Sequence, residues 1–275
     1  MKILITGGNG FIGRNLIKIL KQEHEIFSPS STELDLTDST AVDNYLRNKY
    51  FDWVIHCAIS GGRRTKEDSP YVTYDNLKMF FNLMNNQNRF GKFINFASGA
   101  EFDRKTAINS QSNHLLSSYP TDYYGMSKNI ISRILQDCLH CYNFRVYGVF
   151  GIDENDNRFI KSNIKRYKNK ENLQIFQEKS FDFFYIDDLV AVVKYYVDHP
   201  TYPLDNDMDL VYQQKYKLTD IGKIINNLSA YKVNAEAEDY REASSYLGSN
   251  LGIPLDIELV GLEEGIKQMY NSLKV

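Results

Sequence analysis

The feature that most constrains the fold is a cluster of glycines directly after the first apolar segment of the chain. Lys2–Thr6 has the length and composition of a buried strand, and Ile12–Gln22 has the apolar period of a helix. The residues that join them read Gly7-Gly8-Asn9-Gly10-Phe11. Where Cβ atoms are absent, the backbone can turn tightly and present N–H groups, at the positive end of a helix dipole, to an anion. The sequence therefore predicts a β–α turn that binds a phosphate group.

The spacing of these glycines matches the fingerprint of a dinucleotide-binding turn. Gly8, Gly10 and Gly13 fit the pattern G-x-G-x-x-G, and Gly7, Gly10 and Gly13 fit G-x-x-G-x-x-G. A merely tight β–α turn is the alternative, but the position near the N-terminus, ahead of further β–α units, favours a dinucleotide. The residues expected to contact the cofactor here are Gly7, Gly10, Phe11, Ile12, Gly13 and Arg14.

Apolar runs of strand length alternate with stretches of helical period through the first half of the chain. This order predicts an α/β protein with a Rossmann-like, doubly wound parallel sheet and a smaller C-terminal substrate-binding lobe. We expect residues 1–150 to form the cofactor domain, residues 151–275 mainly the lobe, and residues 181–199 to return to the first domain. The expected strands and helices are Lys2–Thr6, Ile12–Gln22, Glu25–Ser28, Ser39–Lys49, Trp53–Ala58, Val72–Asn85, Lys92–Ala97, Tyr123–Leu139, Asn143–Tyr147 and Phe183–Val197.

Composition and charge exclude several other classes of protein. The chain has 275 residues, of which 43% are hydrophobic and 24% charged, as in soluble globular proteins. Its 32 Lys and Arg against 35 Asp and Glu give a net charge of −3, without the basic excess expected of a nucleic-acid-binding protein. No apolar run approaches the roughly 18 residues that cross a bilayer, and the N-terminus leaves no room for a signal peptide. We expect a cytoplasmic protein that has neither nucleic acid nor a membrane as partner.

The three cysteines, Cys57, Cys138 and Cys141, suit a reducing compartment. The last two match the pattern C-x-x-C, with His140 between them. A zinc site usually needs four ligands, however, and the sequence offers no second pair. We therefore expect part-buried helix residues here and no metal site.

The end of the second expected strand bears on which dinucleotide binds. NAD sites usually carry Asp or Glu there for the ribose 2′-hydroxyl, whereas a 2′-phosphate needs that acid absent and a cation near. The strand ends in Ser28-Pro29-Ser30-Ser31, Arg14 follows the last glycine, and Glu33 lies beyond the expected strand end. NADP, bound as NADPH with Ser30 among its contacts, is therefore the preferred cofactor, while NAD stays open.

A serine, a tyrosine and a lysine form the candidate catalytic group. Tyr124 and Lys128 lie on one face of an expected helix, and Ser98 ends the expected fourth strand, where open α/β sheets bind ligands. A tyrosine with a pKa of about 10 is a poor acid or base at neutral pH, and a neighbouring cation lowers that value. We expect Tyr124, helped by Lys128, to donate a proton to a substrate oxygen that Ser98 holds. An exposed tyrosine and a solvated lysine are the alternative.

Short motifs run along nearly the whole chain, at Gly7–Gly13, Asp35-Leu36, His56-Cys57-Ala58, Ser98, Tyr124–Lys128, Arg145–Gly151, Phe183–Asp188 and Gly261–Gly265. They resemble the extended short-chain dehydrogenase/reductase family, in its nucleotide-sugar epimerase/dehydratase/reductase branch. The resemblance implies that Asp35 and Leu36 hold the adenine, that Cys57 and Ala58 line the cofactor groove, and that Lys128 also binds the nicotinamide ribose. It further implies an NAD(P)-dependent oxidoreductase acting on a nucleotide-diphosphate sugar, and a homodimer formed through the Tyr124 helix and the helix before it.

Missing residues narrow this branch. Sugar 4,6-dehydratases of the family carry an Asp-Glu pair directly after the strand-end serine or threonine, where this chain has Gly99 and Ala100. GDP-fucose synthases, which residues Pro29–Ser39 resemble, epimerise with a cysteine and a histidine; here Ala100 replaces the cysteine, and residues 148–158 contain no histidine. Epimerases of the UDP-galactose type typically show the strand-end acid that is absent here. Neither dehydration nor epimerisation is therefore supported.

The expected function is that of a reductase of a nucleotide-diphosphate-linked 4-keto-6-deoxysugar, in nucleotide-sugar biosynthesis for surface polysaccharide. An NAD(P)-dependent nucleotide-sugar epimerase and a non-catalytic dinucleotide-sensing protein are the alternatives. The chain departs from many relatives at Phe181, where an arginine is usual, and at Gly148, where an asparagine is usual. Arg63, Arg64 and Arg158 are candidates to bind the substrate diphosphate instead, because guanidinium groups pair well with phosphate.

Overall fold

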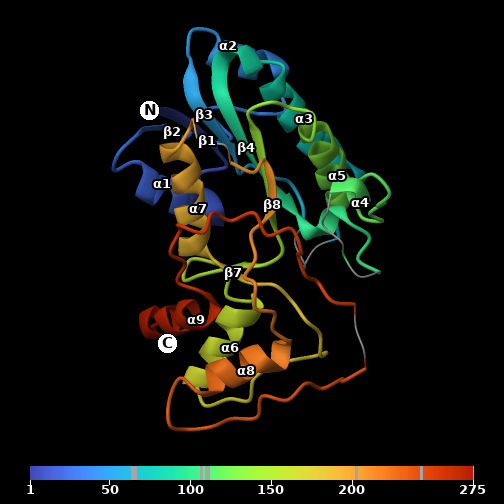
Figure 1. The fold of residues 1–275 in the computed structure, drawn as a ribbon, viewed down its shortest axis with the longest axis vertical. Helices are drawn as coiled ribbons and strands as arrows, with labels where there is room; N and C mark the ends of the chain where they lie inside the picture. Colours follow the sequence, from blue (N-terminus) through green and yellow to red (C-terminus); the bar gives the residue numbers. More distant parts are fainter. Residues whose placement is uncertain (63–66, 106–107, 109–111, 202–203, 242–243, 275) are drawn as a thin grey trace.

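The structure is a computed structural model that describes residues 1–62, 67–105, 108, 112–201, 204–241 and 244–274. Within these residues, six parallel strands form a central sheet in the order β2-β1-β3-β4-β5-β8 (Figure 1). The strands are β1 (Lys2–Thr6), β2 (Glu25–Phe27), β3 (Phe51–His56), β4 (Phe90–Ser98), β5 (Cys141–Val146) and β8 (Asp207–Asp209). The chain leaves β1 toward β2 on one side and returns to β3 on the other, so the sheet has its switch point there. The predicted doubly wound α/β fold is confirmed.

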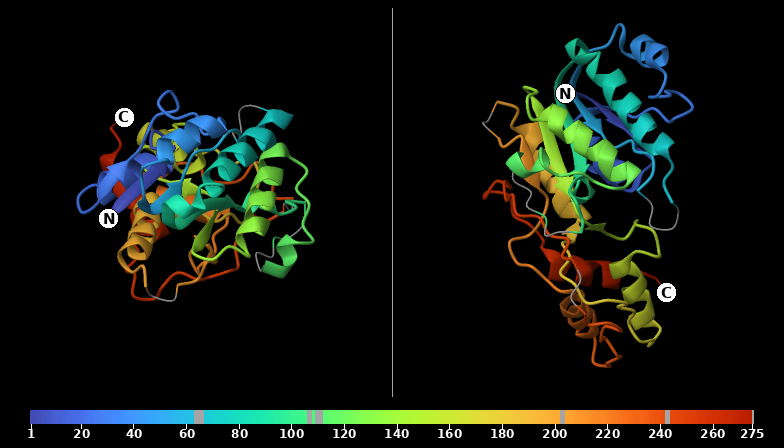
Figure 2. Two further views of the ribbon diagram at one scale, coloured as in Figure 1. Left: turned by 90° about the horizontal axis from the view of Figure 1, so that it is seen from above. Right: turned by 90° about the vertical axis from the view of Figure 1, so that its right-hand side faces the viewer.

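Helices cover both faces of this sheet. On one face, α1 (Phe11–Leu20) packs against α7 (Ile186–Asp198), although nearly 170 residues separate them in the sequence. On the other face, α3 (Pro70–Met84) lies between α2 (Ser39–Leu46) and α5 (Tyr123–Leu135) and contacts both (Figure 1, Figure 2). The remaining short elements of this half are η1 (Gln87–Arg89), η2 (Gly99–Glu101) and α4 (Ser112–Leu115).

The alternation of side chains along each strand divides the interior into two cores. In β1, Ile3 and Ile5 join the core beneath α1 and α7, whereas Leu4 joins the core beneath α3 and α5. All three side chains are fully buried. A strand that is covered on both faces has no solvent-facing side, which explains why it appears in the sequence as a continuous apolar run.

The second half of the chain forms a smaller lobe beyond the carboxyl ends of the strands (Figure 1). A short parallel pair joins the lobe to the sheet, and three helices pack against one another below it. The elements are β6 (Val149–Phe150), β7 (Phe184–Tyr185), α6 (Phe159–Lys168), α8 (Leu218–Asn226) and α9 (Leu262–Ser272). The strand β8, which the sequence did not predict, leaves the lobe and pairs with β5 at the edge of the sheet.

One expected helix is shorter than predicted. The helix expected to reach Leu139 ends at Leu135, as α5. Cys138 therefore lies in the turn after α5, and Cys141 is the first residue of β5. The expectation that both cysteines are helix residues is wrong, because α5 ends at Leu135 and a short irregular stretch, in which His140 has a φ of 62°, leads into β5. Both cysteines are free thiols.

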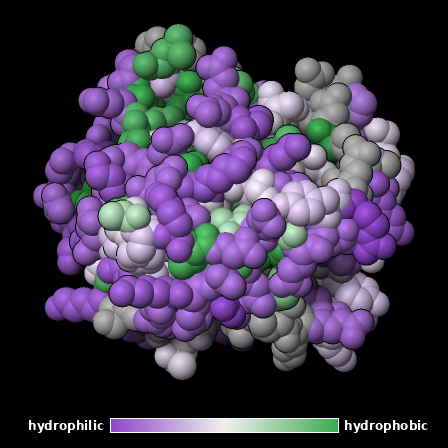
Figure 3. All heavy atoms as spheres, turned by 90° about the horizontal axis from the view of Figure 1, so that it is seen from below, coloured by the Kyte–Doolittle hydropathy of each residue, from purple (hydrophilic) through white to green (hydrophobic). Residues whose placement is uncertain are grey.

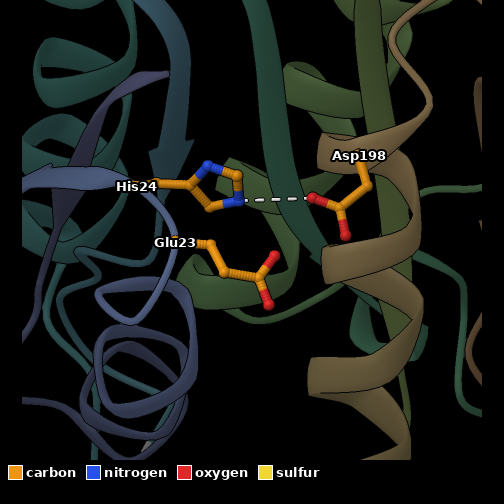
Figure 4. Close-up of side chains that lie close together, drawn as sticks. All are labelled: Glu23, His24 and Asp198. Atoms are coloured by element: carbon orange, nitrogen blue, oxygen red, sulfur yellow. Dashed lines mark ion pairs between the residues drawn. The ribbon is translucent and has the colours of Figure 1, made fainter.

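A cluster of charged side chains ties α7 to the turn between α1 and β2. Lys194 Nζ lies 2.7 Å from a Glu23 carboxylate oxygen and 2.6 Å from an Asp198 oxygen. His24 Nε2 lies 3.2 Å from the other Asp198 oxygen (Figure 4). In the described part of the chain, Glu23, His24 and Asp198 are the one group whose ligand atoms lie close enough to hold a metal ion together. Because the Lys194 ammonium pairs with both carboxylates, we interpret this cluster as an ion-pair link between α7 and the turn after α1.

The surface of the lobe end is mostly hydrophilic, with hydrophobic side chains in separate spots between polar ones (Figure 3). The outer face of α3 differs, because Tyr71, Tyr74 and Phe81 are 73%, 57% and 42% exposed and lie on one side of the helix. No helix among the residues that the structure describes is both long and apolar enough to cross a membrane.

A fully buried arginine joins β5, β8 and the turn that follows β4. The Arg145 guanidinium contacts the Glu101 carboxylate through Nε and lies 2.7 Å from Asp209 and 2.9 Å from Asp207. Burial raises the pKa of the Glu101 carboxyl, and the charge of Arg145 opposes that rise. One cation thus compensates the burial of carboxyl groups from two different segments.

Arg145→Met is expected to destabilise the protein strongly. The methionine keeps much of the side-chain volume but leaves three carboxyl groups without their cation, a change that typically costs about 3–5 kcal/mol of unfolding free energy. Urea unfolding measures the loss. Arg241→Met is the control: Arg241 pairs with Asp239 at the surface, where its side chain is 87% exposed, and its loss should leave the midpoint unchanged. Similar midpoints for the two variants would contradict the role given to Arg145.

Candidate active site

A cavity of about 1160 Å³ opens between the carboxyl ends of the strands and the lobe. It lies at the switch point of the sheet, where ligands of open α/β proteins bind. Residues from the glycine turn, from the end of β4, from the start of α5 and from the lobe line it together. The residues predicted from the sequence that line this cavity are Gly10, Phe11, Ile12, Gly13, Arg14, Cys57, Ser98, Tyr124 and Arg158.

The glycine turn forms a cradle that side chains would fill. Gly7 has a φ of +67°, and a Cβ there would lie 2.6 Å from the Ala58 backbone nitrogen. A Cβ on Gly13 would lie 2.4 Å from the Gly7 carbonyl oxygen. Gly10 begins α1 without a side-chain cap, and the first turn of the helix carries no acidic residue. The N–H groups at this end of α1 therefore face the cavity without a competing anion, which fits the pyrophosphate of a dinucleotide.

Serines, and no acid, follow the last residue of β2. The Ser28 hydroxyl donates to the Ile5 carbonyl oxygen at 2.9 Å. Glu33 turns back onto Ser30, whose backbone N–H and hydroxyl donate to its carboxylate at 2.7 and 2.8 Å. These two hydrogen bonds lower the pKa of Glu33. Ser30, expected to contact the cofactor, is thus engaged by a carboxylate that the sequence placed outside the site.

Asp35 and Leu36, expected to hold the adenine, and Ala58, expected to line the cofactor groove, lie outside the cavity lining. The Asp35 carboxylate is exposed and accepts hydrogen bonds from the backbone and hydroxyl of Thr37 at 2.8 and 2.7 Å. Leu36 is buried in the core beneath α3. The Ala58 N–H donates to the Thr6 hydroxyl at 3.3 Å, next to the glycine turn. The cavity lining thus includes Gly10 and Gly13 of the cradle but none of Asp35, Leu36 and Ala58.

The candidate catalytic residues Ser98, Tyr124 and Lys128 come from the end of β4 and the first two turns of α5. Ser98 ends β4, and α5 begins beside it with its N-terminus capped by Asp122, which accepts from the Gly125 N–H at 2.8 Å. Tyr124 lies in the first turn of α5, and Lys128 follows one turn later, so both face the strand end. The Lys128 ammonium is buried beneath the cavity and donates to the Phe96 carbonyl oxygen at 2.6 Å. It lies 5.9 Å from the centre of the Tyr124 ring.

The net electrostatic effect on Tyr124 differs from the expectation. Burial raises the pKa of Tyr124 above its usual value of 10, and hydrogen bonding with Ser98 only partly opposes that rise. Burial also lowers the pKa of Lys128 to about 8, so its charge is present at pH 7 and is lost as the pH rises through that value. Without bound ligands, Tyr124 is thus a protonated phenol at neutral pH and not a tyrosinate.

Two further titratable side chains lie near Lys128: Cys57, which lines the cavity, and its neighbour His56, which is buried. His56 Nδ1 pairs with the Thr6 hydroxyl at 2.8 Å, and burial lowers its pKa to about 3, which leaves the imidazole neutral. Burial raises the pKa of the Cys57 thiol, which stays protonated. Neither group is a base or a nucleophile at neutral pH.

The space directly after Ser98 is filled by aromatic rings. A Cβ on Gly99 would lie 2.4 Å from the Tyr147 ring and 2.9 Å from Cζ of Tyr246. An aspartate cannot replace Gly99 while these rings stay in place. The first carboxyl group after Ser98 belongs to Glu101, which Arg145 holds in the protein interior. The residues that perform proton transfer in sugar dehydratases thus have no counterpart at this position.

Residues 3–208 match the family model for the NAD dependent epimerase/dehydratase family. The chain belongs to this family. Since the match covers the glycine turn, the strand-end serine and the Tyr124 helix, the predicted membership in the extended dehydrogenase/reductase group is confirmed. The expected enzyme class, an NAD(P)-dependent oxidoreductase, is confirmed with it.

Individual relatives in the family act on nucleotide-linked sugars, by their names. GDP-L-colitose synthase of Yersinia pseudotuberculosis is 24% identical over 259 residues, which cover 84% of this chain and 83% of that protein. GDP-L-fucose synthetase from Naegleria fowleri, solved with NADP, has a TM-score of 0.80 at 18% identity, covering 98% of this chain and 91% of that one. GDP-mannoheptose C4 reductase from Campylobacter jejuni, also with NADP, has a TM-score of 0.78 at 16% identity, with 98% and 97% coverage. At these identities the solved structures establish the fold.

The lobe side of the cavity contains one of the three arginines predicted to bind phosphate. Arg158 lines the cavity with its side chain one-third exposed, and its Nε lies 3.8 Å from Glu154. Burial raises the pKa of Glu154 to about 8, and the charge of Arg158 opposes that rise. Arg63 and Arg64 lie outside the described residues.

Sequence reasoning missed an aromatic wall of the cavity. Tyr246 packs its ring against Tyr147 and Phe181, with 5.0 Å between ring centres in each pair. These residues come from three segments, and Tyr246 follows Tyr124 by more than a hundred residues in a region without regular structure. The high aromatic content, with 20 Tyr and 16 Phe, was the one available signal, and it does not point to particular residues.

Two glycine substitutions separate cofactor binding from stability. A Cβ on Gly13 strikes the Gly7 carbonyl, so Gly13→Ala should push α1 from the turn, weakening NADPH binding and lowering the urea midpoint. A Cβ on Gly10 meets its nearest neighbour only at 3.1 Å and otherwise faces the cavity. Gly10→Ala should therefore weaken binding at least about tenfold while the midpoint stays close to that of the wild type. Fluorescence titration with NADPH and urea unfolding measure the two effects, and undiminished binding by Gly10→Ala would contradict the phosphate cradle.

Proposed function

We propose that the protein is an NADPH-dependent reductase of nucleotide-diphosphate-linked 4-keto-6-deoxysugars, in nucleotide-sugar biosynthesis for surface polysaccharide. The observation that carries this proposal is the one cavity lined by Ser98, Tyr124 and the cradle residues Gly10 and Gly13, with the Lys128 ammonium buried one helical turn after Tyr124. The names of the relatives, GDP-L-colitose synthase and a GDP-mannoheptose C4 reductase, support it. Gly99 and its aromatic neighbours argue against dehydration.

In the proposed reaction, the chain's own residues hold the carbonyl and supply the proton. When bound, the nicotinamide supplies the hydride that reduces the carbonyl carbon. Ser98 donates a hydrogen bond to the carbonyl oxygen, and Tyr124, protonated at neutral pH, gives its proton to that oxygen. Lys128, one turn along α5, binds the nicotinamide ribose and stabilises the tyrosinate that remains. One hydride and one proton thus convert the ketone into an alcohol.

We assign the cofactor to residues 1–150 together with residues 181–199, and the substrate mainly to residues 151–275. In this assignment Gly7, Gly13 and the first turn of α1 bind the pyrophosphate, and Arg158 binds the substrate diphosphate. The preference for NADP rests on Ser28, which occupies the strand end where NAD-specific sites carry an acid, and on Arg14 in the cavity wall. The contact between Glu33 and Ser30 argues in the opposite direction and favours NAD, because a carboxylate repels a 2′-phosphate.

Two residues favour a reductase over an epimerase of the same family. Ala100 stands where GDP-fucose synthases carry their epimerising cysteine, and Ser28 follows the second strand where epimerases of the UDP-galactose type typically carry an acid. A non-catalytic dinucleotide sensor has no need of three converging side chains at a strand end. The reductase is therefore the better-supported function.

The reductase proposal predicts that the protein consumes NADPH and that this consumption depends on the Tyr124 hydroxyl. Purified protein should oxidise NADPH when given a 4-keto-6-deoxysugar linked to GDP, CDP, dTDP or UDP, and should use NADH less well. Tyr124→Phe removes the proton donor and should reduce kcat at least about a hundredfold while NADPH binding is retained. Absorbance at the nicotinamide band measures turnover.

The matched control is Tyr123→Phe, on the preceding residue, whose side chain is 45% exposed. Full activity of Tyr124→Phe, or no turnover with any of the four ketosugars, would refute the proposal.

The reduction rate should fall as the pH rises through about 8, because Lys128 then loses its charge. NAD that copurifies with the protein, together with sugar interconversion without net NADPH use, would indicate the epimerase.

A homodimer formed through α3 and α5 is part of the proposal. Tyr71, Tyr74 and Phe81 form an exposed apolar stripe on α3, which packs beside α5. Light scattering should give twice the chain mass of 31.9 kDa. Phe81→Glu should shift the protein toward the monomer, whereas Phe176→Glu, at a more exposed phenylalanine in the lobe, should not. A monomeric wild type would contradict this interface.

A further inference from the structure

The loop that follows β3 places its backbone against the proposed proton donor. Gly61 and Gly62 have φ of 75° and 70°, in the left-handed region that is costly for residues with a Cβ. A Cβ on Gly62 would lie 2.9 Å from Cδ2 and Cε2 of Tyr124 and 3.1 Å from Cζ, the carbon that carries the hydroxyl. Gly62 and Tyr124 line the same cavity. The absence of a side chain at residue 62 therefore lets the loop pack directly on this ring.

Two polar side chains hold this loop in place. The Gly62 N–H donates to Asp68 Oδ2 at 2.9 Å. Asn76, which lies on α3 and is only 1% exposed, bonds to both backbone groups of Ser60. The Ser60 N–H donates to Asn76 Oδ1 at 2.8 Å, and Asn76 Nδ2 donates to the Ser60 carbonyl oxygen at 3.0 Å. The loop is therefore anchored both at Gly62 and two residues before it.

The same asparagine is bonded to the helical turn that carries Tyr124. Asn76 Nδ2 also donates to Ser127 Oγ at 3.0 Å. Ser127 Oγ in turn donates to the Tyr124 carbonyl oxygen at 2.7 Å. A side-chain amide has two N–H donors, and here one serves the loop and the other serves α5. Asn76 thus links the two sides of the contact between Gly62 and Tyr124.

The direction of the Tyr124 hydroxyl needs such a contact. Side chains in a helix usually pack back onto the preceding turn, but Tyr124 lies in the first turn of α5 and has no such turn behind it. A proton donor must come within about 2.6–3.2 Å of the oxygen that it protonates, and a misplacement of about 1 Å can cost about a hundredfold in rate. Gly62 fills the space on one side of the ring and so limits its rotation.

We propose that Gly62 is a positioning residue, whose backbone packs on the Tyr124 ring and keeps the phenol hydroxyl directed at the substrate carbonyl. Asp68 and Asn76 hold the Gly62 backbone in the place that this role requires. In this role Gly62 acts through Tyr124 and need not touch the substrate. The catalytic consequence rests on the proposed reductase function.

Gly62→Ala tests the proposal, because its methyl group would occupy the place of the ring and force the ring or the loop to shift. We expect kcat for ketosugar reduction to fall at least about tenfold, while the ketosugar KM and the NADPH dissociation constant change less than about twofold. Gly261→Ala is the matched control: Gly261 has a φ of 83°, but a Cβ there meets nothing within 4 Å. Both substitutions strain the backbone and should lower the urea midpoint, but Gly261→Ala should keep full kcat. Equal kcat values for the two variants, or a raised KM at unchanged kcat in Gly62→Ala, would overturn the proposal.

Substitutions of Asp68 test the same contact without adding an atom beside the ring. Asp68→Ala removes the acceptor of the Gly62 N–H, which frees the loop and should lower kcat in the same direction as Gly62→Ala. Asp68→Asn keeps an acceptor oxygen for that N–H and should retain more of kcat than Asp68→Ala. Equal losses in the two variants would overturn the anchoring role of this hydrogen bond.

A measurement without substrate separates this inference from the reductase proposal. In protein labelled with ¹³C at the tyrosine ζ-carbon, the Tyr124 signal is assigned by its loss in Tyr124→Phe. Gly62→Ala should shift this signal, because the new methyl group would lie 3.1 Å from Cζ, whereas Gly261→Ala should leave it in place. A protein that reduces no ketosugar yet shows this shift would refute the reductase and support the packing of Gly62 on Tyr124. An unchanged Tyr124 signal in Gly62→Ala would overturn the contact itself.

Discussion

The arrangement of the active site depends on the buried guanidinium of Arg145. Three carboxylates converge on it from η2 and β8, and the η2 carboxylate belongs to Glu101, three residues after Ser98. Without their cation, burial of these carboxyl groups would cost several kcal/mol each. Arg145 thus joins the strand end that carries Ser98 to the edge strand β8 and, through Asp209, to the backbone of Ser249 and Asn250, shortly after Tyr246. One interior ion cluster sets the relative positions of two sides of the cavity.

The cofactor side of the site depends on backbone shape, which contrasts with this network of charges. Gly7 and Gly13 are required where another backbone approaches within van der Waals distance, and the start of α1 is left without a side-chain cap. NADP and NAD carry the same pyrophosphate, so such a cradle does not distinguish them. The choice between NADP and NAD must come from side chains around it, and there Ser28 and Glu33 act in opposite directions.

The sequence predicted those parts of the fold that local patterns determine. The β1–α1 turn was predictable because its glycines are close in the chain, and Tyr124 with Lys128 because one helical turn separates them. The sequence did not reveal the roles of β8 and Tyr246. A three-residue strand and an irregular segment are positioned only by hydrogen bonds to residues far away in the sequence. The end of the second strand was predicted to lack an acid, yet Glu33 folds back onto Ser30 through contacts that strand boundaries do not encode.

Two titratable side chains, Lys128 and Tyr124, are buried at the site at a cost in stability, and that cost points to a function for them. Lys128 is buried against a carbonyl oxygen with its pKa lowered to about 8, so its charged form is disfavoured by the fold. Tyr124 is buried with its pKa raised, so its ionised form is disfavoured as well. A core built for stability alone would place apolar side chains at these positions. Buried titratable groups that face each other at a strand end are typical of sites that transfer a proton, which agrees with the roles proposed for Tyr124 and Lys128.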